Sequence, residues 1–342
     1  MDTKIPLRLA IIGLGNQAFE HIEAAHQHVD VKIVAGVDHS LICRNKLKQF
    51  DPQIAVFERI EDLLAKQDSL ALDGLILALP HHVYAEMWPT ILAFKRPLLK
   101  EKPLGRDYAE AQHFLQCAEQ QGCPLQTAIQ RRRHPSYQAL YQYLQAHQIK
   151  VSEVHAHLHL GKGQVPSHKI TSSPLPLLSW RGERQQAGGG ALLDAGYHLV
   201  DLVQYLVGPF DVVSSTMWAG QQLDNGYCIE DRSLLLARNE QTWVMLDTWV
   251  QGELSPCGHQ YQKSELIVLQ TNVGVIRADR TGVWHNEQQI CQQAQDWQYA
   301  MRHQLSEFAS NVRQNSWHDE HFWDQLPAMR VIEEAYRLSS RY

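Results

Sequence analysis

The chain has 342 residues, of which 44% are hydrophobic and 20% are charged, and its formal net charge is −6. This is the composition of an ordinary globular protein, and the length favours two domains over one. Basic residues are scattered, and the run 131–133 is too short to make a nucleic-acid surface. The most apolar stretch, 70–80, is too short to cross a bilayer.

The six cysteines form no C-x-x-C pair, so the sequence indicates neither a zinc site nor a disulfide framework. The first predicted strand begins at Leu7, which leaves no room for a signal peptide. We therefore expect a reduced, cytoplasmic protein with no membrane attachment.

The first predicted strand, residues 7–12, is short, aliphatic and ended by a glycine, as buried parallel strands often are. Gly13, Gly15 and Ala18 follow in the pattern G-x-G-x-x-A, and a helical pattern then runs to about residue 28. Between a strand and a helix, this pattern predicts a dinucleotide site. Gly13 would allow the tight turn, Gly15 would let a pyrophosphate approach the backbone, and Ala18 would permit close packing.

The second predicted strand, residues 31–37, is followed by Asp38. A dinucleotide-binding fold places an acidic residue here, where its carboxylate accepts hydrogen bonds from the adenosine ribose. The same carboxylate would repel a 2′-phosphate, so we expect NAD in preference to NADP. Arg44 in the next helix leaves NADP open, and the alternative role for Asp38 is that of a helix cap.

Strands and helices continue to alternate up to about residue 128. This alternation predicts an α/β fold with a doubly wound parallel sheet of the Rossmann type. The chain would then divide into a dinucleotide-binding domain, residues 1–127, and a second domain, residues 128–342. The further predicted elements are strands at 73–79, 97–100 and 124–127, and helices at 82–94 and 107–121.

A charged run of Lys100, Glu101 and Lys102 lies between an apolar strand and Pro103. Residues just past the carboxyl end of a parallel strand face the ligand crevice, so Lys102 is expected at the edge of the nucleotide site. Pro103 fixes its own φ and so holds this lysine on a rigid turn. The alternative is a polar turn with no further role.

The second domain begins with a predicted helix at 135–147 and a strand at 151–160. On this strand His155, His157 and His159 share one face and could bind a metal. Metal ligands more often come from separate elements, so we predict a half-exposed sheet face and no metal site.

Residues 161–187 contain several Gly, Ser and Pro residues and show little periodicity. A loop of this length within a compact domain is often a lid over a binding site. A passive crossing is the alternative, and the sequence favours neither.

A run of three glycines from Gly188 leads into a predicted helix at 191–206. Asp194 and His198 are spaced i and i+4, so they share one face of that helix. A carboxylate beside an imidazole fixes the tautomer of the ring and raises its basicity, as a proton-transferring histidine needs. The glycine run favours this role over a plain surface pair, since such a run lets the backbone approach something closely. Asp201 could complete a metal set, which we do not favour.

The rest of the chain is predicted to form strands and then helices. Eight of the nine tryptophans lie beyond residue 150, where sheet packing or a subunit interface is favoured over sugar stacking. The predicted strands are 212–218, 233–237, 243–249, 266–271, 273–278 and 283–285, and the end, 298–342, is predicted to be helical with Pro327 between two amphipathic stretches.

Together these motifs resemble those of the glucose–fructose oxidoreductase / inositol dehydrogenase / MocA (Gfo/Idh/MocA) family of NAD(P)-dependent oxidoreductases, over nearly the whole chain. E-K-P and the long glycine motif are specific as a pair, because they come from different domains in the right order. The motifs that carry the resemblance are G-x-G-x-x-A from Gly13, Asp38, E-K-P from Glu101, Trp180-Arg181, and G-G-G-x-x-x-D-x-G-x-H-x-x-D from Gly188.

The resemblance implies a Rossmann domain followed by a substrate-binding and oligomerisation α/β domain with an open, mostly antiparallel sheet. The outer face of that sheet commonly forms the subunit interface in the family. Lys102 would lie beside the nicotinamide and the substrate hydroxyl, His198 would be the acid/base, and Asp194 would bind or orient a sugar or polyol. The expected catalytic residues are Lys102, His198 and Asp194; the coenzyme-binding residues are Gly13, Gly15, Asn16, Gln17, Asp38, Pro80, Glu101 and Lys102; the substrate-binding residues are Lys102, Trp180, Arg181, Asp194 and His198.

The chain departs from the family pattern in two places. Tyr84 stands where the family often has a histidine, after His81 and His82. The G-x-I/L-G turn that usually opens the second sheet is absent near residues 148–152.

The sequence thus predicts a cytoplasmic NAD-dependent oxidoreductase, with NADP not excluded. It would interconvert a secondary alcohol and a ketone on a sugar-like small molecule, as a homodimer or homotetramer. Two alternatives stay open: a glycoside hydrolase of the same superfamily that uses bound NAD for transient oxidation, and a non-catalytic NAD-sensing regulator. The presence of Lys102, Asp194 and His198 argues against a pure sensor.

Overall fold

The computed structural model of the chain describes residues 5–160, 180–218, 229–250, 264–293, 297–317 and 325–341. Its packing divides the chain into two compact units. The first comprises residues 1–105, 109–130 and 297–325, and the second comprises residues 106–108, 131–296 and 326–342.

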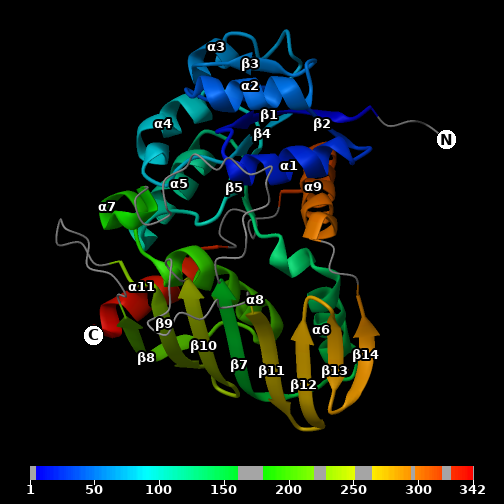
Figure 1. Cartoon of the computed structure of the whole chain (residues 1–342), viewed down its shortest axis with the longest axis vertical. Coiled ribbons are helices and arrows are strands. Elements are labelled where there is room, and N and C mark those ends of the chain that lie inside the picture. The colour runs from blue at the N-terminus through cyan, green and yellow to red at the C-terminus, as the bar shows by residue number, and fades with distance from the viewer. Residues whose placement is uncertain are drawn as a thin grey trace. The chain divides into compact units, whose positions relative to one another are not determined.

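The first unit is built on a six-stranded sheet in the order β3-β2-β1-β4-β5-β6 (Figure 1). Every neighbouring pair of these strands is parallel, so the predicted doubly wound sheet is confirmed. The order reverses between β1 and β4, and open α/β sheets bind their ligands at such a switch point. The strands are β1 (Leu7–Ile12), β2 (Val31–Val37), β3 (Ala55–Phe57), β4 (Gly74–Leu77), β5 (Leu98–Glu101) and β6 (Leu125–Ala128).

Helices join these strands, as the crossovers of a parallel sheet require. Ser40 caps the second of them, because its side chain accepts a hydrogen bond from the amide of Cys43. Gly122 ends the fifth with a φ of 63°, a conformation that glycine adopts readily. The joining helices are α1 (Asn16–His26), α2 (Leu41–Phe50), α3 (Ile60–Leu64), α4 (Val83–Leu92) and α5 (Tyr108–Gln120).

One further helix, α9 (Trp297–Gln314), reaches the first unit from far along the chain and lies beside α1. Its buried side chains Met301, Leu305 and Phe308 belong to the same apolar cluster as Leu9 of β1. This helix therefore completes the core of the first unit, although it follows most of the second unit in sequence.

The second unit is built on a nine-stranded sheet in the order β14-β13-β12-β11-β7-β10-β9-β8-β15. Only the pairs β7–β10 and β8–β15 are parallel, so the predicted mostly antiparallel sheet is confirmed. The strands are β7 (Val151–Leu160), β8 (Asp211–Trp218), β9 (Arg232–Arg238), β10 (Trp243–Val250), β11 (Ser264–Thr271), β12 (Gly274–Asp279), β13 (Gly282–His285), β14 (Gln288–Gln292) and β15 (Ser339–Arg341).

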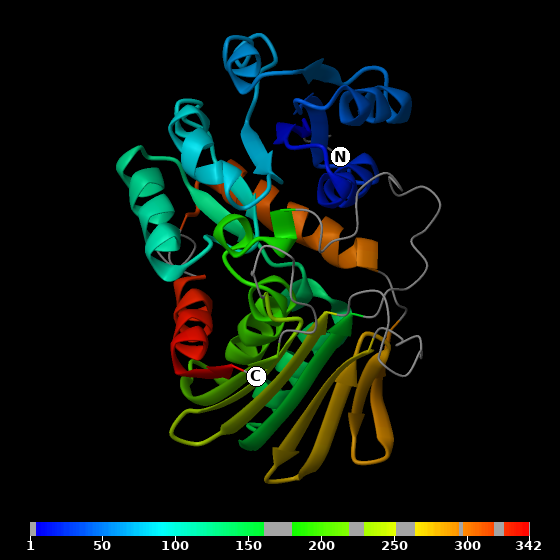
Figure 2. The ribbon, with the colours of Figure 1, turned by 60° about the vertical axis from the view of Figure 1, so that its left-hand side comes forward.

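Helices cover one face of this sheet, as the turned view in Figure 2 shows. The face they cover is lined by the buried side chains of alternate residues, among them Ala156 of β7, Leu246 of β10 and Ile267 of β11. The covering elements are α6 (Pro135–Ala146), a π-helical turn η4 (Leu192–Gly196), α8 (Tyr197–Val207) and α11 (Leu326–Leu338); shorter elements are η1 (Arg131–Arg133), η3 (Trp180–Gly182) and α7 (Arg184–Ala187).

Three local predictions for this unit were wrong or incomplete. The chain end is not helical throughout, because Ser339–Arg341 pair with β8 as β15, a long-range pairing with no local pattern. The strand Gln288–Gln292 was missed, since its glutamines resemble a polar loop. The helix predicted at 191–206 opens with the π-helical turn Leu192–Gly196 before α8 begins.

Candidate active site

The glycine-rich turn connects β1 to α1 in the first unit. Gly13 has a φ of 87°, and a methyl group there would overlap the carbonyl oxygen of Ala78 just beyond β4. Gly15 is exposed, and a methyl group there would meet no other atom within 4 Å. Gly13 is therefore required by the packing of the fold, whereas the space beside Gly15 is open to a ligand.

Gly15 is also the N-cap residue of α1, and no side chain caps this helix. The first helical residues, Asn16 and Gln17, are exposed and half-buried. A helix N-terminus of this kind offers amide groups and a favourable dipole to an anion. The residues of this turn thus fit the pyrophosphate of a dinucleotide.

Asp38 lies directly after β2 and is tied to the same turn. One carboxylate oxygen accepts a hydrogen bond from the amide of Leu14 at 2.7 Å, and the other accepts one from the amide of Ser40 at 2.8 Å. Each carboxylate oxygen has a second lone pair, so both can still accept a hydrogen bond from a ribose hydroxyl. Two amides thus hold the predicted ribose acceptor beside the glycine-rich turn.

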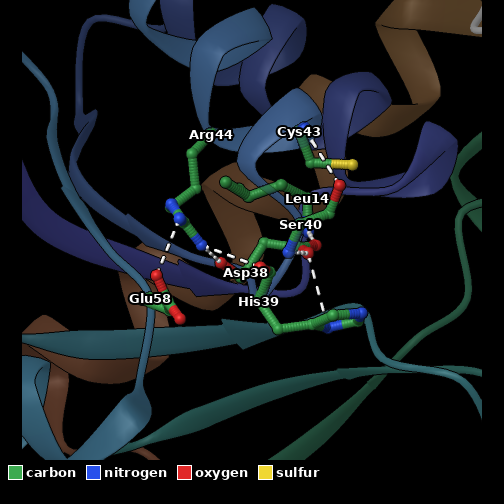
Figure 3. A network of polar contacts seen from close by, with 7 residues as sticks. All are labelled: Leu14, Asp38, His39, Ser40, Cys43, Arg44 and Glu58. Atoms are coloured by element: carbon green, nitrogen blue, oxygen red, sulfur yellow. Dashed lines mark hydrogen bonds and ion pairs between the residues drawn. The ribbon is translucent and has the colours of Figure 1, made fainter.

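Arg44 of α2 lies on one side of Asp38, together with Glu58 (Figure 3). One guanidinium nitrogen donates to the backbone oxygens of Asp38 and His39, at 2.7 and 2.9 Å. The other terminal nitrogen donates to Glu58 Oε2 at 2.8 Å. All three acceptors of this arginine therefore belong to the protein itself.

The carboxyl end of β5 carries Lys100 and Glu101 on opposite faces of the sheet. Glu101 Oε1 lies 2.7 Å from Nε2 of His21, and both side chains are buried. His21 belongs to α1, so this contact fastens the end of β5 to the helix that follows the glycine-rich turn. No motif in the sequence indicates His21, which looks like any other residue of an amphipathic helix.

Lys100 points to the other face, against α4 and α5. Its side chain is 1% exposed, with Nζ 3.8 Å from the centre of the Tyr84 ring and 5.9 Å from that of Phe114. Nζ donates to the backbone oxygens of Glu101 and Pro103, at 3.2 and 2.8 Å. Burial lowers the pKa of Lys100 to about 7, although Glu110 and Glu101 act in the opposite direction.

In the sequence, Lys102 lies between Glu101 and Pro103, whose backbone oxygens accept hydrogen bonds from Lys100. It follows β5 directly and is partly exposed, and its peptide bond to Pro103 is cis. The turn that carries Lys102 is thus held by Lys100 on one face of the sheet and by the Glu101–His21 contact on the other.

The carboxyl end of β4 leads through Pro80 to His81, His82 and α4. The hydroxyl of Tyr84 donates to the Leu77 oxygen at 2.9 Å and accepts from the Leu79 amide at 3.2 Å. This tyrosine is fully buried, and burial raises its pKa well above the ordinary value. Tyr84 therefore ties the end of β4 to the start of α4.

In the second unit, the glycine run from Gly188 packs against the protein itself. A methyl group on Gly188 would overlap the backbone of Arg106, one on Gly189 would overlap the Tyr336 ring, and one on Gly190 would overlap the Glu230 oxygen. The predicted close approach is confirmed, and its partners are parts of the same unit.

Glu230 secures the start of the helix that follows. Its Oε1 accepts hydrogen bonds from the amides of Gly190 and Leu192, at 2.9 and 3.2 Å, and from the Tyr336 hydroxyl at 2.5 Å. Burial raises the pKa of this carboxyl group. Glu230 lies far from the glycine run in sequence, so sequence reasoning missed it.

Asp194 lies in the π-helical turn, a feature that often marks functional positions. Its carboxylate is 3.7 Å from Nε of Arg181, whose guanidinium group lies 4.4 Å from the centre of the Trp180 ring. Three of the predicted substrate-binding residues therefore lie together and partly exposed. They offer a cation, an anion and an aromatic face.

His198 is in the first turn of α8 and is buried. Further along the helix, the fully buried Asp201 accepts two hydrogen bonds from Arg132, at 2.8 and 2.5 Å. Asp201 thus balances the charge of an arginine. Arg131 is likewise buried, 3.2 Å from Glu265, so two residues of this short basic run form ion pairs within the unit.

The three histidines of β7 do share one face of the sheet, each with its own neighbour. His157 and His159 stack at 4.7 Å between ring centres, and burial together with the charge of His159 lowers the pKa of His157. The polar neighbours are Glu153 for His155, Ser264 for His157 and Asp247 for His159.

Among the described residues, no three His, Cys, Asp or Glu side chains lie close enough together to hold a metal ion. Within the same residues, no helix is long and apolar enough to cross a membrane. Most of the stretch 161–187, for which a lid was one prediction, lies outside the described residues.

The predicted site residues therefore fall into two groups, one in each unit. Those for the coenzyme lie at the carboxyl ends of β1, β2, β4 and β5 in the first unit. Those for the substrate, apart from Lys102, surround the π-helical turn of the second unit. Sequence reasoning missed His21, Lys100, Glu58 and Glu230, whose partners are distant in sequence or are backbone groups.

Two family models match the chain. Residues 7–129 match an oxidoreductase family with an NAD-binding Rossmann fold, and residues 147–341 match the C-terminal alpha/beta domain of the oxidoreductase family. The two matches together span most of the chain.

Individual relatives are more distant. The chain is 28% identical over 201 residues to the rhizopine catabolism protein MocA of Rhizobium meliloti, an alignment that covers 59% of this chain and 57% of that protein. The chain spans about half the length of the first curated relatives it matches.

Solved structures share the fold at lower identity. KijD10, a 3-ketoreductase from Actinomadura kijaniata in complex with NADP, is 16% identical, with a TM-score of 0.76 over 98% of this chain and 99% of that one. The WlbA dehydrogenase from Bordetella pertussis, in complex with NADH and UDP-GlcNAcA, is 17% identical, with a TM-score of 0.76 over 97% and 96%.

Proposed function

The chain belongs to the Gfo/Idh/MocA oxidoreductase family, and on that premise we propose that it interconverts a secondary alcohol and a ketone on a sugar, a polyol or a related small molecule. The observation that carries this proposal is the fixed carboxylate of Asp38, which two amides hold beside an open glycine-rich turn. Together they form a site suited to a dinucleotide.

The coenzyme we propose is NAD. Gly15, Asn16 and Gln17 would hold the pyrophosphate at the start of α1, and Asp38 would accept the ribose hydroxyls. Pro80, Glu101 and Lys102 would border the nicotinamide end, at the carboxyl ends of β4 and β5. When bound, NAD supplies the acceptor or donor of the hydride.

The residues of the chain would move the proton and stabilise the charge. His198 would take the hydroxyl proton during oxidation and return it during reduction. Lys102 would stabilise the negative charge that develops on the substrate oxygen. Asp194 would orient the substrate, with Arg181 and Trp180 beside it.

The WlbA dehydrogenase, which is in complex with UDP-GlcNAcA, supports a sugar-like substrate. Arg181 and the Trp180 ring add a cation and a stacking surface, which suit a polar ring compound with an acidic group. The free thiols of Cys43, Cys117, Cys123 and Cys291 support a cytoplasmic setting.

A screen of sugars, polyols and sugar nucleotides for NADH production tests this proposal. With an active substrate in hand, Lys102→Met should lower kcat and leave NAD affinity nearly intact, because its charge matters mainly as the alkoxide develops. His198→Asn should lower kcat roughly 10²–10⁴-fold, the usual effect of losing a general base. Steady-state kinetics and NAD titration measure both effects.

Three further variants complete the design. Asp194→Asn should act mainly on KM, and Lys66→Met, which removes an exposed lysine of the first unit, should leave kcat and KM unchanged. If Lys102 and His198 act together in the same catalytic step, the double variant should lose far less kcat than the product of the two single losses. Turnover by His198→Asn at the wild-type rate would remove this histidine from the mechanism.

A further inference from the structure

We propose that Glu58 sets the preference for NAD over NADP by occupying Arg44, a cation that could otherwise bind the 2′-phosphate of NADP. This inference rests on the proposed use of NAD and deepens it. It assigns coenzyme choice to a second carboxylate besides Asp38.

The topology brings Glu58 to the ribose end of the site. Strands β2 and β3 are parallel neighbours in which Val37 pairs with Phe57. The residues that directly follow these strands are Asp38 and Glu58, and the Asp38 amide donates to the Phe57 oxygen at 3.2 Å. Both carboxylates thus lie at the carboxyl edge of the sheet, where nucleotides bind.

One of the two terminal nitrogens of Arg44 binds a partner, Glu58, that a phosphate could replace. The nitrogen that binds the oxygens of Asp38 and His39 is anchored to the backbone. The nitrogen that binds Glu58 meets a side chain that is 65% exposed, while Arg44 itself is 13% exposed. If Glu58 were neutral, that nitrogen could bind a phosphate with the same side-chain conformation (Figure 3).

Electrostatic repulsion also disfavours the binding of NADP. A 2′-phosphate carries nearly two negative charges and would lie beside the carboxylates of Asp38 and Glu58. Arginine binds phosphate strongly through charge-assisted hydrogen bonds, but Glu58 already uses this capacity. The 2′-phosphate of NADP would therefore be repelled by two carboxylates and would find Arg44 already paired with Glu58. NAD has a 2′-hydroxyl in place of that phosphate, so neither effect weakens its binding.

The test compares calorimetric titrations of NAD and NADP into wild-type protein and Glu58→Gln. The glutamine keeps the size of the side chain and removes its charge. We expect the Kd for NADP to fall roughly three- to tenfold, the range set by a weak exposed ion pair and one new phosphate contact. The Kd for NAD should change less than about twofold.

The matched control is Glu61→Gln, which removes the same charge nearby from a side chain that is 54% exposed. Glu61 pairs with Arg59 at 3.3 Å and makes no contact with Arg44 among the described interactions. It should leave both affinities unchanged. Glu58→Ser gives a second removal of the charge and should act as Glu58→Gln does.

A double variant identifies Arg44 as the residue through which Glu58 acts. In Arg44→Met/Glu58→Gln, the gain for NADP should disappear, since a methionine cannot bind phosphate. The gain in Glu58→Gln should also shrink as salt is raised, because exposed charges are screened.

The possible outcomes separate the two proposals. If wild-type protein binds NAD but Glu58→Gln and Glu58→Ser bind NADP no better than Glu61→Gln does, the role of Glu58 is refuted and the proposed function stands. Tighter binding of NADP than NAD by wild-type protein also refutes it. Binding of neither coenzyme to wild-type protein overturns the proposed function and this inference together.

Discussion

Two charged side chains at the coenzyme end of the first unit, Asp38 and Lys100, bind backbone groups. Asp38 accepts from the Leu14 and Ser40 amides, and Lys100 donates to the oxygens of Glu101 and Pro103. The sequence could place Asp38 and Lys102, because a residue after a parallel strand faces the ligand edge. It could not indicate Lys100, whose role depends on the fold of the turn after it.

The buried Lys100 should make the stability of the protein depend on pH. Its pKa falls from the usual 10.5 to about 7, with burial as the main cause. Between these values the unfolded chain holds a proton that the folded protein has lost, so the free energy of unfolding should rise with pH across this window. Below about pH 7 the folded protein must hold a buried charge.

Urea denaturation of wild type and Lys100→Met from pH 6.5 to 10 measures this effect. The difference in unfolding free energy, wild type minus variant, should rise with pH. Lys66→Met, which changes an exposed lysine of the same unit, should give a difference that does not vary with pH. A flat profile for Lys100→Met would show that Lys100 keeps an ordinary pKa.

At the scale of elements, the chain contains two glycine turns that look alike in sequence and differ in structure. Gly15 faces open space at the start of α1, whereas Gly190 packs on Glu230. The sequence predicted a close approach at both, but a sequence does not identify what approaches. Only the fold distinguishes a turn open to a ligand from one closed by its own chain.

This difference predicts opposite effects of a single methyl group. Gly190→Ala should lower the free energy of unfolding by at least about 2 kcal/mol, because the methyl overlaps backbone that cannot move away. Gly15→Ala should change it by less than about 1 kcal/mol and weaken NAD binding roughly tenfold, since the methyl enters the space for the pyrophosphate. Thermal unfolding and NAD titration measure the two properties. Equal losses of stability would contradict the assignment.

Buried strands were the easiest elements to predict. Strands β1, β2 and β4 of the first unit are rich in aliphatic residues, and β7 alternates between polar and apolar residues, so the hydrophobic pattern located them. Three-residue β3 and β15 have too few residues to show a pattern, and polar β14 resembles a loop. The π-helical turn contacts Glu230, which is remote in sequence, and Arg181 of η3, so no local pattern indicates it.

At the scale of the whole molecule, one face of the nine-stranded sheet lacks a covering helix among the described residues. On that face Met245 of β10 is 39% exposed and pairs in register with His155 on one side and Leu236 on the other. An open sheet face with exposed apolar side chains commonly marks an interface. This supports the proposed homodimer or homotetramer.

Met245→Glu should therefore shift the protein toward the monomer, because it would place a charge on the sheet face where a second copy is proposed to pack. Sedimentation velocity at micromolar concentration measures the mass. Val29→Glu, a matched change at an exposed valine of the first unit, should leave the mass unchanged. A stable wild-type monomer would contradict the proposed assembly.

The return of α9 to the first unit has a consequence for how the protein is made. Domains generally fold as units, often while the ribosome is still adding residues. Here the nucleotide-binding core lacks Met301, Leu305 and Phe308 until that stretch has left the exit tunnel. The sheet of the first unit therefore stays incompletely packed while almost the whole of the second unit is translated. A nascent chain stalled before residue 297 would expose apolar core residues of the first unit to chaperones.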